Sequence, residues 1–313
     1  MIVNRGTNML TLAKRSRVAI GMLVLLAIVF EALYYTAWAD WERTPLPISI
    51  SSVLITALTI FLAFRVGEAY GRWWEARQLW GKMVNLSRSF TRSVLTLHWP
   101  EGVEGESLSR ELVYRHIAYI NALRIRLREA AAYADAKKHY TEWEAMLPEA
   151  DLPRYRAAKN VPAFLLLRQS EVIKDSLGAA VSERIAWREL NGLLTELTDV
   201  QGGCERIKHT IFPDSVTYFT RVLVWFLAPI LLLTVLEEKS LIYDMLEVVV
   251  VILTALVFVV IEQLGRDLKN PFENEPNDTP MSALCRTIEI DLRQHLGEDD
   301  LPEPLEPVKG VLM

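Results

Sequence analysis

Residues that commonly carry out chemistry are few in this sequence and are not grouped. The two cysteines, Cys204 and Cys285, have no neighbouring cysteine or histidine at a spacing that binds a metal. The five histidines recur at no fixed interval, and the glycine-rich, zinc-protease and nucleophile motifs of common enzymes are missing from the sequence. We therefore predict that the protein is not an enzyme and that no cofactor is required.

Three residues have a spacing that suits a pore. Thr56, Ile60 and Phe64 follow one another at intervals of four within an uncharged apolar run, so they lie along one face of a helix. In a monomer, such a face packs against other helices. In an oligomer that turns it toward a central axis, rings of its side chains would form a hydrophobic constriction that gates by losing its water.

Charged and aromatic residues follow this run directly, in the segment FRVGEAYGRWWEARQLWG. The group of interest is Arg72, Trp73, Trp74, Glu75 and Arg77. Tryptophans gather at membrane surfaces, and the charged side chains are available for pairs between helices. We expect this group to form a junction between a membrane part and a water-exposed part.

The elements that position these residues are predicted to be helices. The chain has 313 residues, 51% of them hydrophobic, and the apolar residues are concentrated in four windows, 18–39, 48–64, 216–236 and 241–261. A helix needs about 20 mostly apolar residues to cross a bilayer, so each window predicts a transmembrane helix. The alternative is a soluble protein with buried core helices. The first window is too long for a signal peptide and lacks a clear cleavage site.

Basic residues predict the orientation of these helices. They precede the first window and follow the second, so by the positive-inside rule both flanks and both termini are cytoplasmic. The periodic middle of the chain then forms a cytoplasmic helical region, and the protein is expected to be a multi-pass protein of the inner cell membrane. The expected segments are 1–66 with the first two spans, 67–214 as the cytoplasmic region, 215–262 with the last two spans, and 263–313 as a cytoplasmic helix and tail. A net charge of −5 argues against nucleic acid as a partner.

Three segments resemble the signature segments of the bacterial branch of the bestrophin family, in the expected order. They are FRVGEAYGRWWEARQLWG, DVQGGCERIKHT and NPFENEPNDTPMSALCRTIEIDL. The resemblance implies an all-α membrane protein with four transmembrane helices per subunit, a homopentamer around one pore, and passive flow of monovalent ions. Animal bestrophins are calcium-activated chloride channels and bacterial relatives include cation-conducting ones. The resemblance therefore leaves open whether this pore conducts an anion such as chloride or a cation such as sodium.

The resemblance also implies roles for individual residues. The family's neck of three hydrophobic rings falls on Thr56, Ile60 and Phe64, although Thr56 departs from the large apolar type and would make the outermost ring wetter. A second, cytoplasmic constriction is expected at Ile173.

The calcium clasp of animal members would fall on Asn270, Glu275 and Asp278. The acidic residues of this segment are interrupted by asparagine and proline, whereas calcium needs six to eight oxygen ligands. A capped turn that leads into a helix near Pro280 is the simpler interpretation.

Two other classes of protein compete with a channel. A secondary transporter usually shows repeated halves and ionisable residues near mid-membrane, whereas Glu31 and Glu247 lie nearer the outer ends of their windows and the two pairs of windows show no symmetry. A membrane scaffold that conducts nothing would keep the uncharged face around Ile60 packed rather than open. For Glu31 and Glu247 themselves we favour a structural role. The expected partners are the lipid bilayer, permeant ions and further copies of the chain.

Overall fold

The computed structural model describes residues 16–36, 47–128, 143–210, 214–235, 241–308 and 310–312. In these residues all regular elements are helices, apart from one isolated bridge between Val308 and Val311. The chain divides into two compact units. We call residues 4–72 and 211–269 the span unit, and residues 1–3, 73–210 and 270–313 the bundle unit.

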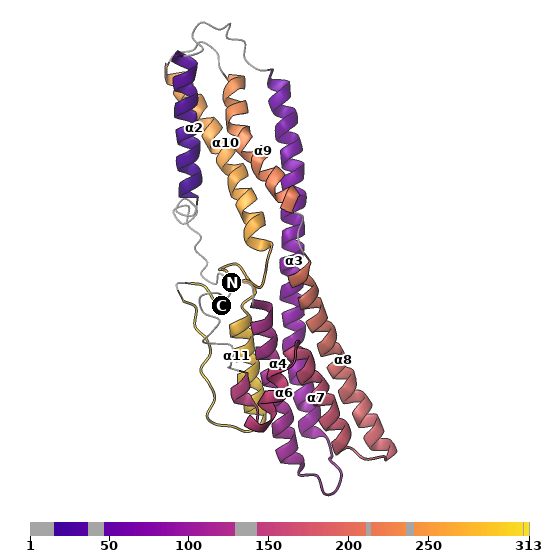
Figure 1. Ribbon diagram of the computed structural model, residues 1–313. Coiled ribbons are helices and arrows are strands. Elements are labelled where there is room, and N and C mark those ends of the chain that lie inside the picture. The colour runs from indigo at the N-terminus through magenta and orange to yellow at the C-terminus, as the bar shows by residue number, and fades with distance from the viewer. Residues whose placement is uncertain are drawn as a thin grey trace. The chain divides into compact units, whose positions relative to one another are not determined.

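The span unit contains three helices and the first half of a fourth (Figure 1). They are α2 (Arg17–Thr36), α3 (Ile48–Thr96) up to residue 72, α9 (Asp214–Val235) and α10 (Leu241–Leu268). Small and branched residues pack between them, with Leu62 of α3, Val224 of α9 and Ala255 of α10 each buried. Gly265 lets α10 approach α3, because a Cβ there would lie 3.3 Å from Val66 Cγ2.

Helix α3 has 49 residues and therefore a length of about 73 Å at 1.5 Å per residue. Its first turns hold several hydroxyl side chains, which have no water to bond to in a hydrocarbon environment. These hydroxyls donate to the helix's own backbone. Thr56 Oγ1 donates to the Ser52 carbonyl over 2.8 Å, and Thr59 Oγ1 donates to the Ile55 carbonyl over 2.7 Å. Such bonds make polar residues tolerable in a membrane helix.

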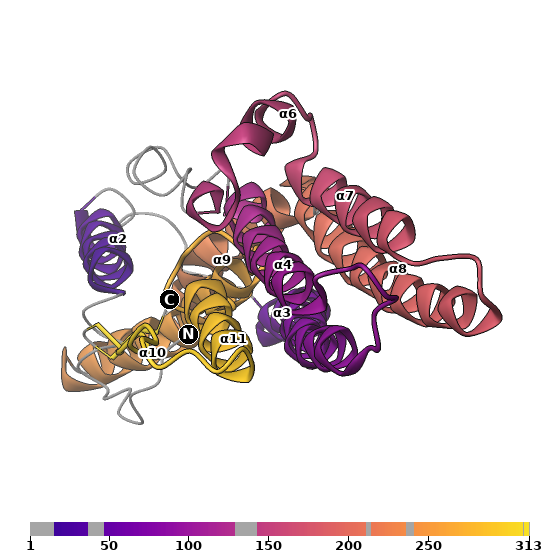
Figure 2. The ribbon, with the colours of Figure 1, turned by 90° about the horizontal axis from the view of Figure 1, so that it is seen from below.

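The bundle unit packs the second half of α3 against shorter helices (Figure 2). They are α4 (Gly105–Arg128), α6 (Leu152–Arg156), α7 (Val161–Ser176), α8 (Val181–His209) and α11 (Met281–His295), with 3-10 turns at Glu144–Met146 and Glu149–Asp151. Two helices have capped starts. Asn160 Oδ1 accepts from Ala163 N at the start of α7, and Glu183 Oε2 accepts from Ala180 N at the start of α8.

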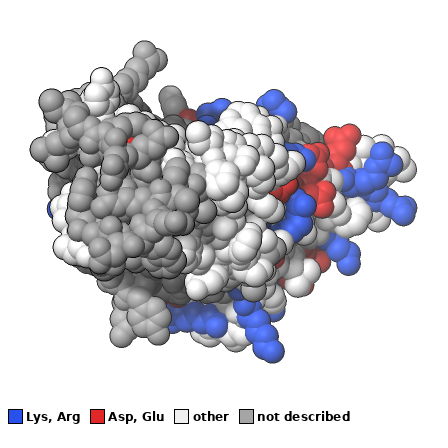
Figure 3. All heavy atoms as spheres, turned by 90° about the horizontal axis from the view of Figure 1, so that it is seen from above, with Lys and Arg blue, Asp and Glu red and all other residues white. Residues whose placement is uncertain are grey.

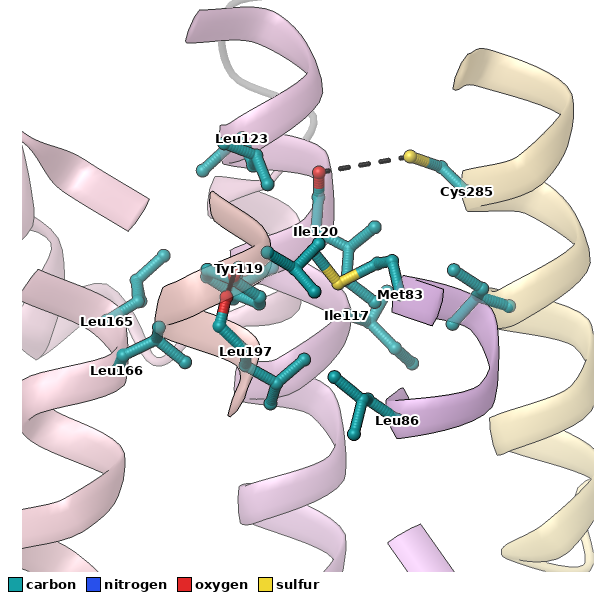
Figure 4. Close-up of a cluster of buried hydrophobic side chains, with 14 of the residues drawn as sticks. Met83, Leu86, Ile117, Tyr119, Ile120, Leu123, Leu165, Leu166, Leu197 and Cys285 are labelled. Atoms are coloured by element: carbon teal, nitrogen blue, oxygen red, sulfur yellow. Dashed lines mark hydrogen bonds between the residues drawn. The ribbon is translucent and has the colours of Figure 1, made fainter. Parts of the chain in front are cut away.

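Apolar side chains from five helices meet in the core of the bundle unit (Figure 4). Met83 of α3, Ile117 of α4, Leu165 of α7 and Leu197 of α8 lie within it, each at most 1% exposed. Cys285 of α11 completes it, and its thiol lies 3.8 Å from the Ile120 carbonyl. This unit therefore has a closed hydrophobic core of its own.

The helices of the span unit follow the apolar windows of the sequence and extend past some of them. Helix α3 begins at residue 48, as the window does, whereas α10 continues seven residues beyond residue 261 because its charged last turns remain helical. Among the described residues, three helices are long and apolar enough to cross a membrane, in α3, α9 and α10. The described apolar part of α2 is shorter, Arg17–Phe30. Residues 37–39 and 236, which belong to the first and third windows, lie outside the described residues.

The boundaries between the two units fall at other positions than the boundaries between the segments expected from the sequence. The divisions follow residues 72, 210 and 269, whereas the expected segments end at 66, 214 and 262. The physical reason is that α3 and α10 keep packing against neighbours of the span unit for one or two turns after their apolar runs end. Arg72 shows this directly, since its Nε donates to the Lys269 carbonyl over 3.2 Å within the span unit.

Candidate ion pathway

The three residues predicted for the neck lie on one exposed stripe of α3. Phe64 is 73% exposed and Ile60 is 51% exposed, and Thr56 is exposed as well. Leu58 and Leu62, which lie about 200° around the helix from Ile60 and Phe64, are buried against the other helices of the span unit. The stripe therefore points away from the chain's own core and is available to other copies, to lipid or to water.

Exposed apolar surface is a property of the whole span unit. Within the chain only 22% to 28% of each candidate span is buried. Seen from above, the central part of the described surface carries no Lys, Arg, Asp or Glu atoms, and these charged residues gather toward the right and lower edges of the view (Figure 3). Monomeric soluble proteins rarely expose so large an apolar area. These faces need lipid or neighbouring subunits to cover them.

A buried ion pair closes the charged end of the spans. Arg65 Nη1 donates to Glu262 Oε1 over 3.0 Å, and both side chains are at most 4% exposed. Because an isolated charge is costly in a low-dielectric setting, each group makes the other tolerable. In the sequence, Arg65 is one of the basic residues that follow the second apolar window, and no local pattern predicts its pairing with Glu262, which is 197 positions away. One hint was readable in the sequence: Arg65 directly follows the uncharged run 48–64, and Glu262 directly follows the uncharged run 248–261.

The junction residues make contacts within their own units. In the span unit, Arg72 bonds to the end of α10. In the bundle unit, Trp73 Nε1 donates to the Asn277 carbonyl over 2.7 Å, and the Trp73 and Trp74 rings lie 6.2 Å apart. Glu75 forms an ion pair with Arg206 of α8.

The remaining predicted junction residue, Arg77, is half-buried on α3 beside Gly81, where a Cβ would lie 3.6 Å from its Nη1. Between Arg77 and Gly81, at Leu79, α3 and α8 come close to each other. A Cβ on Gly203, in the segment DVQGGCERIKHT, would lie 3.0 Å from both methyl carbons of Leu79, so glycine leaves room for this close approach. Two of the quoted signature segments therefore meet where α8 crosses α3.

Ile173 does not have the surroundings expected of a constriction. Its side chain is 1% exposed and lies in the core of the bundle unit, between α7 and its neighbours. A side chain enclosed by its own chain cannot line an aqueous opening, so the structure contradicts this assignment. Exposed apolar residues occur a few positions later instead, at the start of α8, where Val181 is 75% and Ile185 is 52% exposed.

The candidate cation clasp is a tight turn whose acidic side chains point to different partners. Asp278 is buried, and its Oδ2 accepts from Glu275 N over 3.1 Å. Glu273 instead pairs with Lys208 over 2.7 Å, while Glu275 and Asn270 are exposed. Burial, together with the neighbouring carboxylates, raises the pKa of Asp278 to about 6. In the described residues, groups of three or more His, Cys, Asp or Glu that could hold a metal are absent.

Long apolar helices with exposed faces, an uncharged stripe and a charged junction define a helical membrane protein of the kind that assembles around a pore. The chain belongs to the bacterial and fungal bestrophin family, whose model, described as "Bacterial/Fungal Bestrophin protein", matches residues 5–294. The resemblance seen in the sequence is thereby confirmed.

Individual relatives agree with this membership. The chain is 30% identical to the voltage-dependent anion channel-forming protein YneE of Escherichia coli K12 over 294 residues, 93% of this chain and 90% of the relative. It is also 30% identical to the protein RSc3414 of Ralstonia nicotianae, named in the same way, over 82% of this chain and 81% of that one. The crystal structure of a bacterial bestrophin homolog from Klebsiella pneumoniae is 25% identical and has a TM-score of 0.76, covering 89% of this chain and 97% of that chain. The all-α fold is therefore bestrophin-like.

Proposed function

We propose that this chain is one subunit of a homopentameric channel that conducts monovalent ions passively through a central pore. The observation that carries the proposal is the uncharged stripe of α3, which is exposed although two of its three residues, Ile60 and Phe64, are large and apolar. The names of the curated relatives, which describe channel formation, support the same class of activity. No enzymatic step and no cofactor is part of this proposal.

The proposed topology has four spans, formed by α2, α3, α9 and α10. The bundle unit and both termini face the cytoplasm, and the membrane is the inner cell membrane. The support comes from the basic residues that flank the first two spans, since such residues accumulate on the cytoplasmic side.

In the proposed pore, the stripes of five α3 helices face one axis. Rings of Ile60 and Phe64 form a neck that empties of water when narrow and conducts when wetted. Thr56 adds a ring whose hydroxyls already donate to the helix backbone, so they offer a passing ion acceptor oxygens rather than protons. Residues 48–64 carry no charge. The neck therefore discriminates by hydration, and charges elsewhere along the pore set the sign of the permeant ion.

A second constriction belongs to the same proposal, but at Val181 or Ile185 rather than at Ile173. Both are exposed apolar side chains at the start of α8, as a ring at a cytoplasmic exit would require. The turn at Asn270, Glu275 and Asp278 is proposed as a structural turn without calcium. Its support is that Glu273 and Asp278 are already engaged by a lysine and a backbone N–H.

The test is single-channel recording of the purified full chain in planar bilayers under asymmetric salt. We compare the wild type with the double variant Ile60→Ala, Phe64→Ala. A wider and less hydrophobic neck dewets less readily, so we expect an open probability or conductance several-fold above the wild type. The reversal potential gives the sign of the ion, and chelation of calcium should leave the current unchanged.

The chain offers a matched control in α10. Leu253 and Val257 are also four positions apart, apolar and more than half exposed, so the double variant Leu253→Ala, Val257→Ala removes similar surface from another span. It should conduct like the wild type. An equal effect of both double variants would contradict the neck assignment. Folded protein that carries no current in any form, but moves solute in a flux assay, would favour a transporter.

A further inference from the structure

A cavity with an excess of positive charge lies at one end of the span unit. Its volume is about 300 Å³, and it is formed where α2 begins, α9 begins and α10 ends. Figure 1 shows these three helix ends at the same end of the unit. The polar lining consists of Ser16, Arg221, Glu262, Gln263 and Arg266.

The arginines around this cavity have more donors than the nearby carboxylate can accept. Glu262 lies 3.0 Å from Arg65, 3.0 Å from Arg266 and 3.7 Å from Arg221. Each guanidinium has five N–H donors, whereas one carboxylate has about four acceptor positions. Arg221 and Arg266 remain 44% and 41% exposed, so part of each guanidinium faces outward. The three arginines and Glu262 together carry a net charge of +2.

Ser16 provides an independent sign of a ligand. Its side chain is 3% exposed and lines the cavity, and its Oγ has no hydrogen-bond partner in the described part of the chain. Buried polar groups are normally bonded, so an orphaned hydroxyl that faces a cavity indicates a missing partner. Ser16 also stands at the start of α2, where free backbone N–H groups and the helix dipole favour an anion.

The other side of the cavity is apolar. Its walls there are Val18, Ala19, Met22, Val224, Trp225 and Val259. These residues continue into the exposed apolar faces of the spans, where Val18 is 64% exposed and Met22 is 45% exposed. A ligand that fits both parts has an anionic head and a hydrocarbon tail.

From these contacts we infer that the cavity binds the phosphate of an anionic phospholipid, with its acyl chains along α2 and α9. Arg221 and Arg266 hold the phosphate oxygens, Ser16 Oγ donates to one of them, and the apolar walls receive the first part of the chains. Arginine suits this role because its planar fork bonds two phosphate oxygens at once. The inference uses the proposed topology only to place the site in the cytoplasmic leaflet, and it does not depend on conduction.

The test uses the full chain in neutral detergent, without any current measurement. Phosphatidylglycerol and phosphatidylcholine are titrated separately, and bound lipid is counted by native mass spectrometry while the thermal unfolding midpoint is followed by tryptophan fluorescence. We expect phosphatidylglycerol to be retained and to raise the midpoint, and phosphatidylcholine to do neither. Each arginine near a lipid surface changes affinity by about fivefold, so Arg221→Gln with Arg266→Gln should weaken phosphatidylglycerol binding about 25-fold.

Two further variants keep the result interpretable. Ser16→Ala should weaken lipid binding several-fold and leave the lipid-free midpoint unchanged, because its hydroxyl has no bond to lose. Arg88→Gln is the matched control, since Arg88 is 47% exposed and pairs with Asp291 in the bundle unit; it should bind lipid like the wild type.

Three results would overturn the inference. Equal retention of the two lipids would make the cavity an unselective hydrocarbon groove. Equal loss in Arg88→Gln would show a general charge effect. Competition by glycerol 3-phosphate at the concentration at which the lipid binds would assign the site to a free phosphate compound. If the protein carried no current, the bound-lipid count and the unfolding midpoint would still test this inference.

Discussion

The bundle unit and the span unit solve the burial of apolar residues in opposite ways. In the bundle unit, large side chains such as Trp80, Tyr119 and Phe90 are fully enclosed by their own chain. In the span unit, only 22% to 28% of each candidate span is buried within the chain. The first unit carries its own core, whereas the second depends on what surrounds it, because soluble proteins rarely leave so large an apolar area uncovered.

The same contrast governs charges. The pair Lys82 and Glu196 in the bundle unit is about half exposed, and water stabilises each partner on its own. The pair Arg65 and Glu262 in the span unit is enclosed, so water could not hydrate either charge if its partner were removed. A buried pair is costly to break, although replacing both partners by apolar residues can be neutral.

Breaking the buried pair should therefore give the largest effect. Arg65→Met leaves the Glu262 carboxylate short of its most buried partner, and we expect a loss of about 3–5 kcal/mol in unfolding free energy. The double variant Arg65→Met, Glu262→Leu should recover most of that loss. The measurement is thermal unfolding in detergent followed by tryptophan fluorescence.

The exposed pair supplies the control for this experiment. Lys82→Met should cost less than about 1 kcal/mol, because the exposed partner Glu196 keeps its hydration. If Lys82→Met and Arg65→Met were equally destabilising, the two units would not differ in the way that their burial indicates.

A truncation in each unit tests the contrast for apolar residues. Leu123 is fully buried in the core of the bundle unit, so Leu123→Ala should cost about 2–5 kcal/mol through lost burial and a residual cavity. Leu25 of α2 is 61% exposed, and Leu25→Ala should change the unfolding midpoint little. Both are measured in detergent by the same assay. A large loss in Leu25→Ala would show that another subunit covers this face in the assembly.

Local patterns in the sequence predicted much of this fold but not its tertiary pairings. The interval of four from Thr56 to Phe64 is a property of one helix, and the structure places all three residues on one exposed stripe. The three helices long enough to cross a membrane, α3, α9 and α10, each follow an apolar window of the sequence. The assignment of Thr56, Ile60 and Phe64 to a pore neck stays a prediction, since a single chain does not show what the stripe faces.

The errors and omissions arise where distant segments meet. Ile173 has the residue type of a constriction, but its burial is decided by helices that pack around α7, and no local pattern reports them. The pair of Arg65 with Glu262 and the approach of Gly203 to Leu79 likewise join segments more than a hundred residues apart. In each case the sequence shows the type of the residue, but it does not show which distant residue packs against it or pairs with it.

The last prediction concerns stability in acid and tests whether the core of the bundle unit is closed to water. His116 is fully buried between Phe90 and Tyr119, with ring centroids 5.1 Å and 5.7 Å away. Burial lowers the pKa of His116 from 6.5 to about 3, since the core disfavours the charged imidazolium. The folded protein therefore keeps this ring neutral while the unfolded chain protonates it, so its contribution to stability is complete above pH 6.5 and is lost progressively as the pH falls toward 3.

Replacing the ring tests this directly. His116→Phe keeps an aromatic side chain in the core and removes the titrating group, so its unfolding free energy should fall less steeply in acid. Between pH 6.5 and 5 the wild type should lose about 2 kcal/mol more than the variant. Every other titrating group is shared, so the difference between the two curves reports His116 alone. Parallel curves would mean that water reaches this ring in the folded protein, and the bundle unit would then be less closed than its burial indicates.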